Sequence, residues 1–159
     1  MDYREYDTRL AAYAVIVDEQ DRILLALWNG GPSPEWTMPG GAVELDESVE
    51  EAAVRELREE TGYDVVLGAV LGVHTEVVPA AERIRSEDRR RALKGVRVVF
   101  EARVVAGQLT AETDGSTDEP RWIPLDEVAS LPRVELVDAS VQMWRDRGRV
   151  VQPLASDQR

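Results

Sequence analysis

The most informative stretch of the chain is residues 41–63, which read GAVELDESVEEAAVRELREETGY. Ser48 and Glu51, three residues apart, form a capping box that satisfies backbone donors at the first turn of a helix. Gly62 follows the last predicted turn, where a left-handed C-terminal cap suits glycine. The residues between them are mostly good or acceptable helix formers. The stretch therefore predicts a helix from about Ser48 to Gly62.

Three carboxylates stand at positions i, i+3 and i+4 of this predicted helix. Glu56, Glu59 and Glu60 would cluster on one side, where like charges repel one another. At about 100° per residue they fall on or beside the apolar side of the helix. Part-buried carboxylates cost free energy unless they are paired or bind a metal, and the nearby Arg55 can neutralise only one of the three. Oxygen ligands of this kind favour a hard divalent cation, Mg²⁺ first.

The same residues resemble the Nudix box, G-x5-E-x7-R-E-U-x-E-E-x-G-U, in which U is a bulky apolar residue. Every fixed position matches, and Tyr63 fills the last one, where Ile, Leu or Val is more usual. The preceding residues 36–41, WTMPGG, are similar to the usual lead-in. A surface helix with an acidic patch is the plain alternative, but it would not fix residue types at so many positions in a loop–helix context.

The resemblance implies a fold, a domain organisation and an activity. The expected fold is of the α/β class, an α/β/α sandwich with a mixed β-sheet and the box loop and helix. One domain would cover residues 1–159, with a frayed tail over about 150–159. The expected activity is that of a MutT-like hydrolase acting on acid anhydrides. Such an enzyme cleaves a nucleoside diphosphate linked to another moiety, by attack of a metal-activated water at phosphorus.

The resemblance also assigns roles to the residues of the box. Glu56, Glu59 and Glu60 correspond to ligands of Mg²⁺, with Mn²⁺ as a substitute, and the carbonyl of Gly40 is expected as another ligand. Glu47 and Arg55 resemble the pair that orients the ligand carboxylates, although a salt bridge that only stabilises the loop would use the same residues. The number of metal ions stays open.

The general base is open between Glu59 in the box and Glu119, which precedes a short predicted strand and resembles a later catalytic position of the family. Asp118 and Glu112 are rivals of Glu119 in the same acidic segment. His74 is the only histidine. Its ordinary pKa suits a base, but a single histidine in a strand pattern is more often a structural or surface residue.

Composition limits the partners of the chain. The net charge of −12 argues against a nucleic-acid polymer, because binding to a phosphate backbone needs a basic surface. No cysteine is present, so disulfides and thiolate metal sites are excluded. Neither a signal-peptide pattern nor an apolar run of membrane-spanning length occurs, and the expected location is cytoplasmic. The expected partner is a small nucleotide; the oligomeric state, a homodimer included, stays open.

One segment departs from the acidic composition. Residues 82–97 carry seven basic and three acidic side chains. We interpret them as a basic loop whose Arg89, Arg91 and Arg97 bind substrate phosphates with their planar guanidinium groups. A solvated loop that only neutralises acidic surface is the alternative reading. Trp28, beside a glycine-rich loop, is a candidate for stacking on a nucleobase.

Periodicity and turn residues predict the remaining elements. A loop is expected from Thr110 to Glu119. Strands and helices are interleaved without a regular alternation, which favours a mixed sheet with helices on both sides. The predicted strands are Leu10–Val17, Arg22–Trp28, Trp36–Met38, Asp64–Val78, Val96–Ala106 and Arg121–Ile123, and the predicted helices after the box are Leu125–Ser130 and Val134–Arg147.

The substrate is less well defined than the family. A proline stands 16 residues past the box at Pro79, which resembles the ADP-ribose pyrophosphatase branch, although its neighbours Val78 and Ala80 do not. ADP-ribose-like compounds and nucleoside triphosphates, oxidised ones included, both stay open. The alternative to an enzyme is a non-catalytic Nudix domain that senses a nucleotide, but such a domain is expected to lose box carboxylates. A Ca²⁺-binding structural protein is not favoured, because the spacing of an EF-hand loop is absent.

Overall fold

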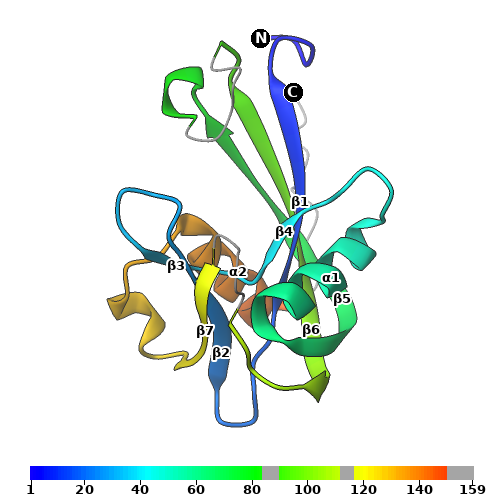
Figure 1. The fold of residues 1–159 in the computed structure, drawn as a ribbon, viewed down its shortest axis with the longest axis vertical. Helices are drawn as coiled ribbons and strands as arrows, with labels where there is room; N and C mark the ends of the chain where they lie inside the picture. Colours follow the sequence, from blue (N-terminus) through cyan, green and yellow to red (C-terminus); the bar gives the residue numbers. More distant parts are fainter. Residues whose placement is uncertain (84–89, 112–116, 150–159) are drawn as a thin grey trace, which may run out of the picture.

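The computed structural model describes residues 1–83, 90–111 and 117–149 of the chain. Figure 1 shows a mixed α/β arrangement in which strands occupy the centre and helices flank them. None of the helices in this described part has the length and hydropathy to cross a bilayer. The elements, in chain order, are β1 (Asp7–Val15), β2 (Arg22–Trp28), β3 (Glu35–Thr37), β4 (Gly40–Ala42), α1 (Val49–Thr61), β5 (Tyr63–Val78), η1 (Ala80–Glu82), β6 (Leu93–Gly107), β7 (Thr117–Pro124), η2 (Val128–Ser130) and α2 (Glu135–Asp146).

The strands form two sheets. The larger has the order β4-β1-β6-β5, and it is mixed because β1 and β6 are parallel while the other pairs are antiparallel. The smaller is antiparallel with the order β3-β2-β7. A backbone hydrogen bond links the two sheets: Leu24 of β2 donates its N–H to the carbonyl of Ile16, just after β1, at 3.0 Å. The mixed sheet predicted from the sequence is therefore confirmed.

Alternation along β1 places a core on each face of the larger sheet. Ala12, Ala14 and Ile16 belong to a buried cluster with Ala52, Ala53 and Leu57 of α1. The intervening Val15 belongs to a second cluster, which includes Leu136, Val137 and Val141 of α2. Successive side chains of a strand point to opposite faces, so α1 and α2 cover the two faces of the sheet. This arrangement is the expected α/β/α sandwich.

The helix predicted from the capping box is confirmed in detail. Ser48 caps α1, and its side chain and that of Glu51 bond each other's backbone N–H groups. The helix ends at Gly62, whose φ of 76° lies in the left-handed region. A side chain there would also meet the carbonyl of Gln108, 2.3 Å from an added Cβ atom.

Several predicted boundaries are wrong. The supposed basic loop 82–97 and acidic loop 110–119 both end in strands, since β6 begins at Leu93 and β7 at Thr117. Leu93 pairs with Asp7 of β1 on one side and with Val78 of β5 on the other, so ladder bonds on both sides override the polar local composition. The predicted helix Leu125–Ser130 is only the 3-10 turn η2, and β4 was not predicted because Gly40 and Gly41 have low strand propensity.

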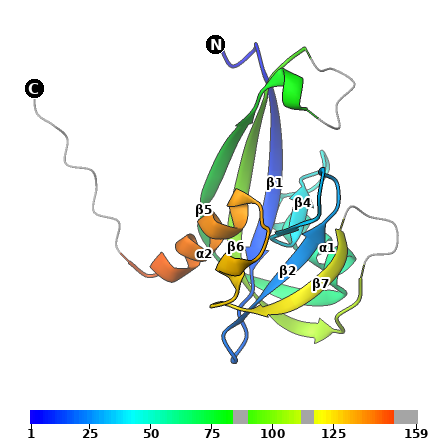
Figure 2. The same ribbon diagram turned by 90° about the vertical axis from the view of Figure 1, so that its left-hand side faces the viewer.

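One part of the larger sheet extends beyond the helices. Figure 2 shows β1, β5 and β6 running together past α1 and α2, with η1 near their tip. We call this part, formed by residues 7–11 of β1, 72–78 of β5 and 93–98 of β6, the arm. It brings residues from three distant parts of the sequence above the box.

Candidate active site

The box helix places two carboxylates against the glycine pair of β4. Glu60 is 7% exposed and its carboxylate accepts the backbone N–H of Gly40 at 2.8 Å. A Cβ atom at Gly41 would stand 2.5–2.7 Å from the carboxylate atoms of Glu56. Only glycine therefore leaves space for the Glu56 carboxylate beside the backbone. Gly40 has φ +139°, and a Cβ atom there would stand 2.2 Å from the carbonyl of Ala12, so Gly40 allows β4 to lie close to β1 while Gly41 leaves room for Glu56 of α1.

Arg55 connects the carboxylates of the box. Its guanidinium binds Glu47 through two hydrogen bonds, from Nε at 2.9 Å and from Nη2 at 2.7 Å. Nη1 donates to Glu56 at 2.9 Å and to Glu59 at 3.1 Å, and Nη2 also donates to the carbonyl of Ala42 at 3.1 Å. A planar donor with five N–H groups suits such a network. The predicted Glu47–Arg55 pair is thus present.

The network shifts the protonation equilibria of its members. The hydrogen bonds from Arg55, and the backbone N–H of Glu44 in second place, lower the pKa of Glu47 to about 2. The same contact with Glu47 raises the pKa of Arg55, against the opposing effect of its partial burial. Both groups are therefore charged over the whole physiological range, and Arg55 is held in one orientation against the helix.

The structure separates the three predicted ligand carboxylates. Glu56 and Glu60 line a cleft with Gly40 and Gly41. The Glu59 side chain is 51% exposed and turns toward Arg55 on the outer side of α1. Among the described residues, no three Asp, Glu, His or Cys side chains gather closely enough to hold a metal ion. The i, i+3 and i+4 spacing alone would leave all three on one side of the helix, but Arg55 Nη1 binds Glu59 at 3.1 Å and holds its carboxylate on the outer side.

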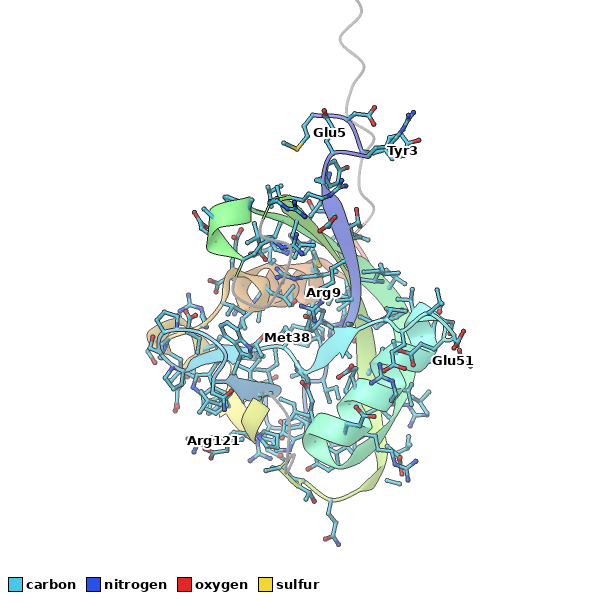
Figure 3. All side chains as sticks on the ribbon, turned by 45° about the horizontal axis from the view of Figure 1, so that its top comes forward. Tyr3, Glu5, Arg9, Met38, Glu51 and Arg121 are labelled. Carbon is cyan, nitrogen blue, oxygen red and sulfur yellow. The ribbon has the colours of Figure 1, made fainter. Side chains whose placement is uncertain are left out.

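The cleft has a volume of about 520 Å³ and lies between α1, the strands β1, β3 and β4, and the start of α2. Figure 3 labels Arg9 on β1, at the arm side of this region. Its charged lining comprises five glutamates, Glu35, Glu56, Glu60, Glu76 and Glu135, and two arginines, Arg9 and Arg97. The excess of carboxylates would repel a diphosphate unless cations balance it.

Of the four predicted substrate-binding residues, two line the cleft. Trp28 lines the cleft, and its ring packs against Gly31, where an added Cβ atom would stand 2.8 Å away. Arg97 also lines the cleft, but from β6 rather than from a loop. Arg91 does not line it: its guanidinium binds Asp7 at 2.8 Å and the carbonyls of Arg4 and Tyr6. Arg89 lies outside the described residues.

Glu119 does not occupy the loop position expected from the sequence. It lies in β7 opposite Leu27, whose side chain packs against the core on the α2 side. Residues paired across a ladder point to the same face, so Glu119 lies on the face opposite α1. Its carboxylate accepts a hydrogen bond from Arg121 Nε at 3.2 Å, and it does not line the cleft in the described structure. Its role as a base stays a prediction. Glu112 is outside the described residues, as is the side chain of the other rival, Asp118.

Sequence reasoning missed the titratable residues of the cleft outside the box other than Arg97, including Glu35 of β3. Arg9 and Tyr13 alternate on one face of β1, and Glu76 and Glu135 come from β5 and α2. Burial raises the pKa of Tyr13, while Arg97 and Arg9 act in the opposite direction. His74, with a side chain 11% exposed, lies between Arg97 and Glu135, whose carboxylate is 3.8 Å from its Nε2. Only the alternation around Arg9 was visible in the sequence, and it does not reveal which face becomes the cleft.

Comparison with known proteins places these features in a family. The model of the NUDIX domain family matches residues 7–144. The chain is 34% identical over 118 residues, 74% of its length, to an ADP-ribose pyrophosphatase of Methanocaldococcus jannaschii, of which this covers 64%. It is 46% identical over 63 residues to a putative 8-oxo-dGTP diphosphatase of Bacillus subtilis. These residues make up 40% of this chain and 41% of that protein. The chain thus spans less than two thirds of the length of these curated relatives.

Solved structures show the same fold. A NUDIX hydrolase from Nitrosomonas europaea superimposes with a TM-score of 0.72 at 22% identity, covering 87% of this chain and 89% of that one. The MutT protein from Methanosarcina mazei Go1 gives a TM-score of 0.66 at 26% identity, covering 91% and 99% of the two chains. With a family match over most of its length and the complete box on helix α1, the chain belongs to the NUDIX family.

Proposed function

We propose that this protein is a divalent-metal-dependent diphosphohydrolase. Its substrate would be a nucleoside diphosphate linked to another moiety, either an ADP-ribose-like compound or a nucleoside triphosphate, oxidised ones included. The observation that carries the proposal is the Arg55 network, which holds Glu56 at the floor of a cleft beside Glu60 and the glycine pair. The names of relatives, an ADP-ribose pyrophosphatase and a putative 8-oxo-dGTP diphosphatase, support the same substrate classes.

The donor set of the cleft fits Mg²⁺ or Mn²⁺. Glu56 and Glu60 provide carboxylate oxygens, the Gly40 carbonyl is the further ligand expected from the family resemblance, and Glu59 is close enough to share Arg55 Nη1 with Glu56. Such hard oxygen donors suit these cations. When bound, the cation would neutralise diphosphate charge and lower the pKa of a bound water. The excess of glutamates in the lining makes this charge balance necessary.

The chemistry assigned to the chain is a hydrolysis. The oxygen of water forms a bond to one phosphorus of the diphosphate, and the anhydride P–O bond breaks. The products are a nucleoside monophosphate and the phosphorylated second moiety. One proton of the water passes to a carboxylate base and from there to bulk solvent or the leaving oxygen. Arg55 holds the Glu56 and Glu59 carboxylates in position for these tasks.

For the base we favour Glu59 over Glu119. Glu59 reaches the same guanidinium nitrogen as Glu56, so rotation of one side chain would bring it to the cleft. Glu119 lies on the far face of β7 and is paired with Arg121. A base must come within hydrogen-bond reach of the attacking water, and Glu59 shares Arg55 Nη1 with Glu56, which lines the cleft.

A nucleotide panel tests the proposal. The protein would be incubated with ADP-ribose, other nucleoside diphosphate sugars and nucleoside triphosphates, with Mg²⁺, with Mn²⁺ and with EDTA, and monophosphate release followed by chromatography. We expect turnover of at least one class with either cation and none with EDTA. Saturable nucleotide binding without any monophosphate release would instead indicate a nucleotide-sensing domain.

A further inference from the structure

The arm presents one row of charged side chains to the cleft. In the ladder, Gly95 of β6 pairs with Arg9 on β1 and with Glu76 on β5, and two residues along β6 Arg97 pairs with His74. Paired residues and their i+2 neighbours point to the same face of a sheet. Arg9, Glu76 and Arg97 consequently all line the cleft, on the arm side of the box carboxylates.

Gly95 lets these side chains share one space. It contributes no side chain between Arg9 and Glu76, and a Cβ atom added there would stand 3.9 Å from Arg97 Nε. The guanidinium of Arg97 therefore lies over the glycine, beside the strand that carries Arg9. Both arginines also act on the buried hydroxyl of Tyr13, which places their positive fields in the same part of the cleft.

The two arginines differ in whether a neighbouring carboxylate neutralises their charge. Arg97 forms an ion pair with Glu76 and contacts His74 Nδ1 at 3.4 Å, so it is held in place by its neighbours. Arg9 forms no ion pair or hydrogen bond with any side chain in the described part of the chain. Glu135, the other carboxylate on this side, has a side chain 85% exposed. The arm side of the cleft thus has a guanidinium that the described side chains leave available for an anion.

The distance from the box indicates which part of a substrate would reach this group. Tyr13 pairs with Gly40 beside the box, and Arg9 lies four residues further along the same strand. At 3.3 Å per residue the two positions are about 13 Å apart along the backbone, and the side chain of an arginine can bridge part of that length. Arg9 therefore faces the group attached to the scissile diphosphate rather than the diphosphate itself.

We propose that Arg9 and Arg97 form a second anion site and that the preferred substrate carries a further negative charge beyond the scissile diphosphate, as the third phosphate of a nucleoside triphosphate does. This inference rests on the proposed function and refines it. Guanidinium groups bind phosphate oxygens through paired hydrogen bonds. A neutral sugar, as in ADP-ribose, would leave Arg9 without a counter-charge.

The test compares two substrates with one nucleoside, ATP and ADP-ribose, which both release AMP. In Mg²⁺ buffer, Arg9→Gln should lower kcat/KM for ATP by about tenfold or more, the effect of losing one charged hydrogen-bonded contact, and should lower kcat/KM for ADP-ribose several-fold less. Arg9→Lys keeps the charge but not the planar group and should fall between. Arg103→Gln removes an exposed arginine elsewhere on β6 and serves as the matched control. Equal losses on both substrates in Arg9→Gln would overturn the second anion site.

A binding measurement makes the test independent of turnover and of the preferred base. Inorganic tripolyphosphate in Mg²⁺ buffer would be titrated while tryptophan fluorescence is followed, since Trp28 lines the cleft. Arg9→Gln should weaken tripolyphosphate binding about tenfold, and pyrophosphate binding less; equal affinities in wild type and variant would contradict the inference. The proposed function is tested separately by Glu60→Gln: retained hydrolysis in that variant would refute the catalytic assignment and leave the result on Arg9 to be judged by tripolyphosphate alone.

Discussion

The box and the arm of this protein line the same cleft but are built in different ways. In the box, residues 40–60 supply the glycines, the carboxylates and Arg55, which bond one another within one turn-and-helix unit. On the arm side, Arg9, His74, Arg97 and Glu135 come from β1, β5, β6 and α2. The box is therefore determined by local sequence, whereas the arm site exists only after the larger sheet and α2 have assembled.

The difference has a chemical counterpart. The charged groups that bind Arg55 are all carboxylates of the box. The pKa shifts of Glu47 and Arg55 show how strongly these groups depend on one another. The arm side contains a cation, Arg9, that no described side chain neutralises. We infer that the box is suited to a reaction common to the family, and that the arm is suited to selection among substrates.

The largest expected effect is on the box. Glu60→Gln removes a buried carboxylate charge while it keeps the size of the side chain and an oxygen for the Gly40 N–H. Turnover should fall by orders of magnitude, and thermal stability should change little or rise through relief of repulsion between neighbouring carboxylates. Glu50→Gln, an exposed position on the same helix, is the matched control. Full activity of Glu60→Gln at limiting Mg²⁺ would contradict the assignment of the reaction to the box carboxylates.

A second variant tests the geometry of the box without changing any charge. Gly41→Ala places a Cβ atom at 2.5 Å from Glu56 and must displace its carboxylate. Because the glutamate side chain is flexible, the displacement costs little stability but misplaces a ligand, so we expect kcat to fall at least about tenfold. Steady-state kinetics with a melting curve would measure both. A variant that unfolds at room temperature would show that Gly41 is needed for folding. A folded variant with unchanged kcat would show that Gly41 does not position Glu56 for the reaction.

The Arg55 network predicts a pH dependence of stability. The pKa of Glu47 falls from 4.5 to about 2 on folding. A lowered pKa contributes stability that is present above the unfolded value and is lost as the pH falls toward the folded one. Glu47→Gln should thus be less stable than wild type at pH 7, with the difference shrinking between about pH 4.5 and pH 2. Urea unfolding at several pH values measures this; a difference that is constant with pH would mean that Arg55 does not favour the charged form of Glu47.

The smallest effect is expected at Glu119. Since this residue lies in β7 on the face away from α1, Glu119→Gln should leave kcat within about twofold of wild type, while Glu59→Gln depresses it strongly. The two variants would be compared by their steady-state rates at saturating substrate. A loss in Glu119→Gln comparable to that in Glu59→Gln would assign the base to β7 and would imply that β7 or its preceding residues move when substrate binds.

The contrast between box and arm also explains what could be predicted from the sequence. The capping residues Ser48 and Gly62, the α1 boundaries and the Glu47–Arg55 pair depend on neighbours close in sequence, and the structure contains each of them. The rotation of Glu59 away from the cleft was not foreseen, because helical spacing fixes directions around an axis but not the competition of Arg55 for one carboxylate.

The remaining errors concern residues whose environment is set across the sheets. Leu93–Gly95 and Thr117–Glu119 have polar or basic neighbours that suggest loops, yet pairing with β1, β5 and β2 makes them strands. Arg91 was expected to meet phosphates, but its partner Asp7 is 84 positions away in the sequence. Such contacts are created by register, which local composition does not encode.

The most direct test of the central claim, that Glu56 and Glu60 form the core of a divalent-cation site, is a titration of Mn²⁺ followed by electron paramagnetic resonance. Wild-type protein, Glu60→Gln and the control Glu50→Gln would be compared without nucleotide. Our account predicts that Glu60→Gln weakens Mn²⁺ binding by about tenfold or more, while the control binds as wild type does. Equal Mn²⁺ affinity in all three proteins would contradict the assignment of the box carboxylates as metal ligands.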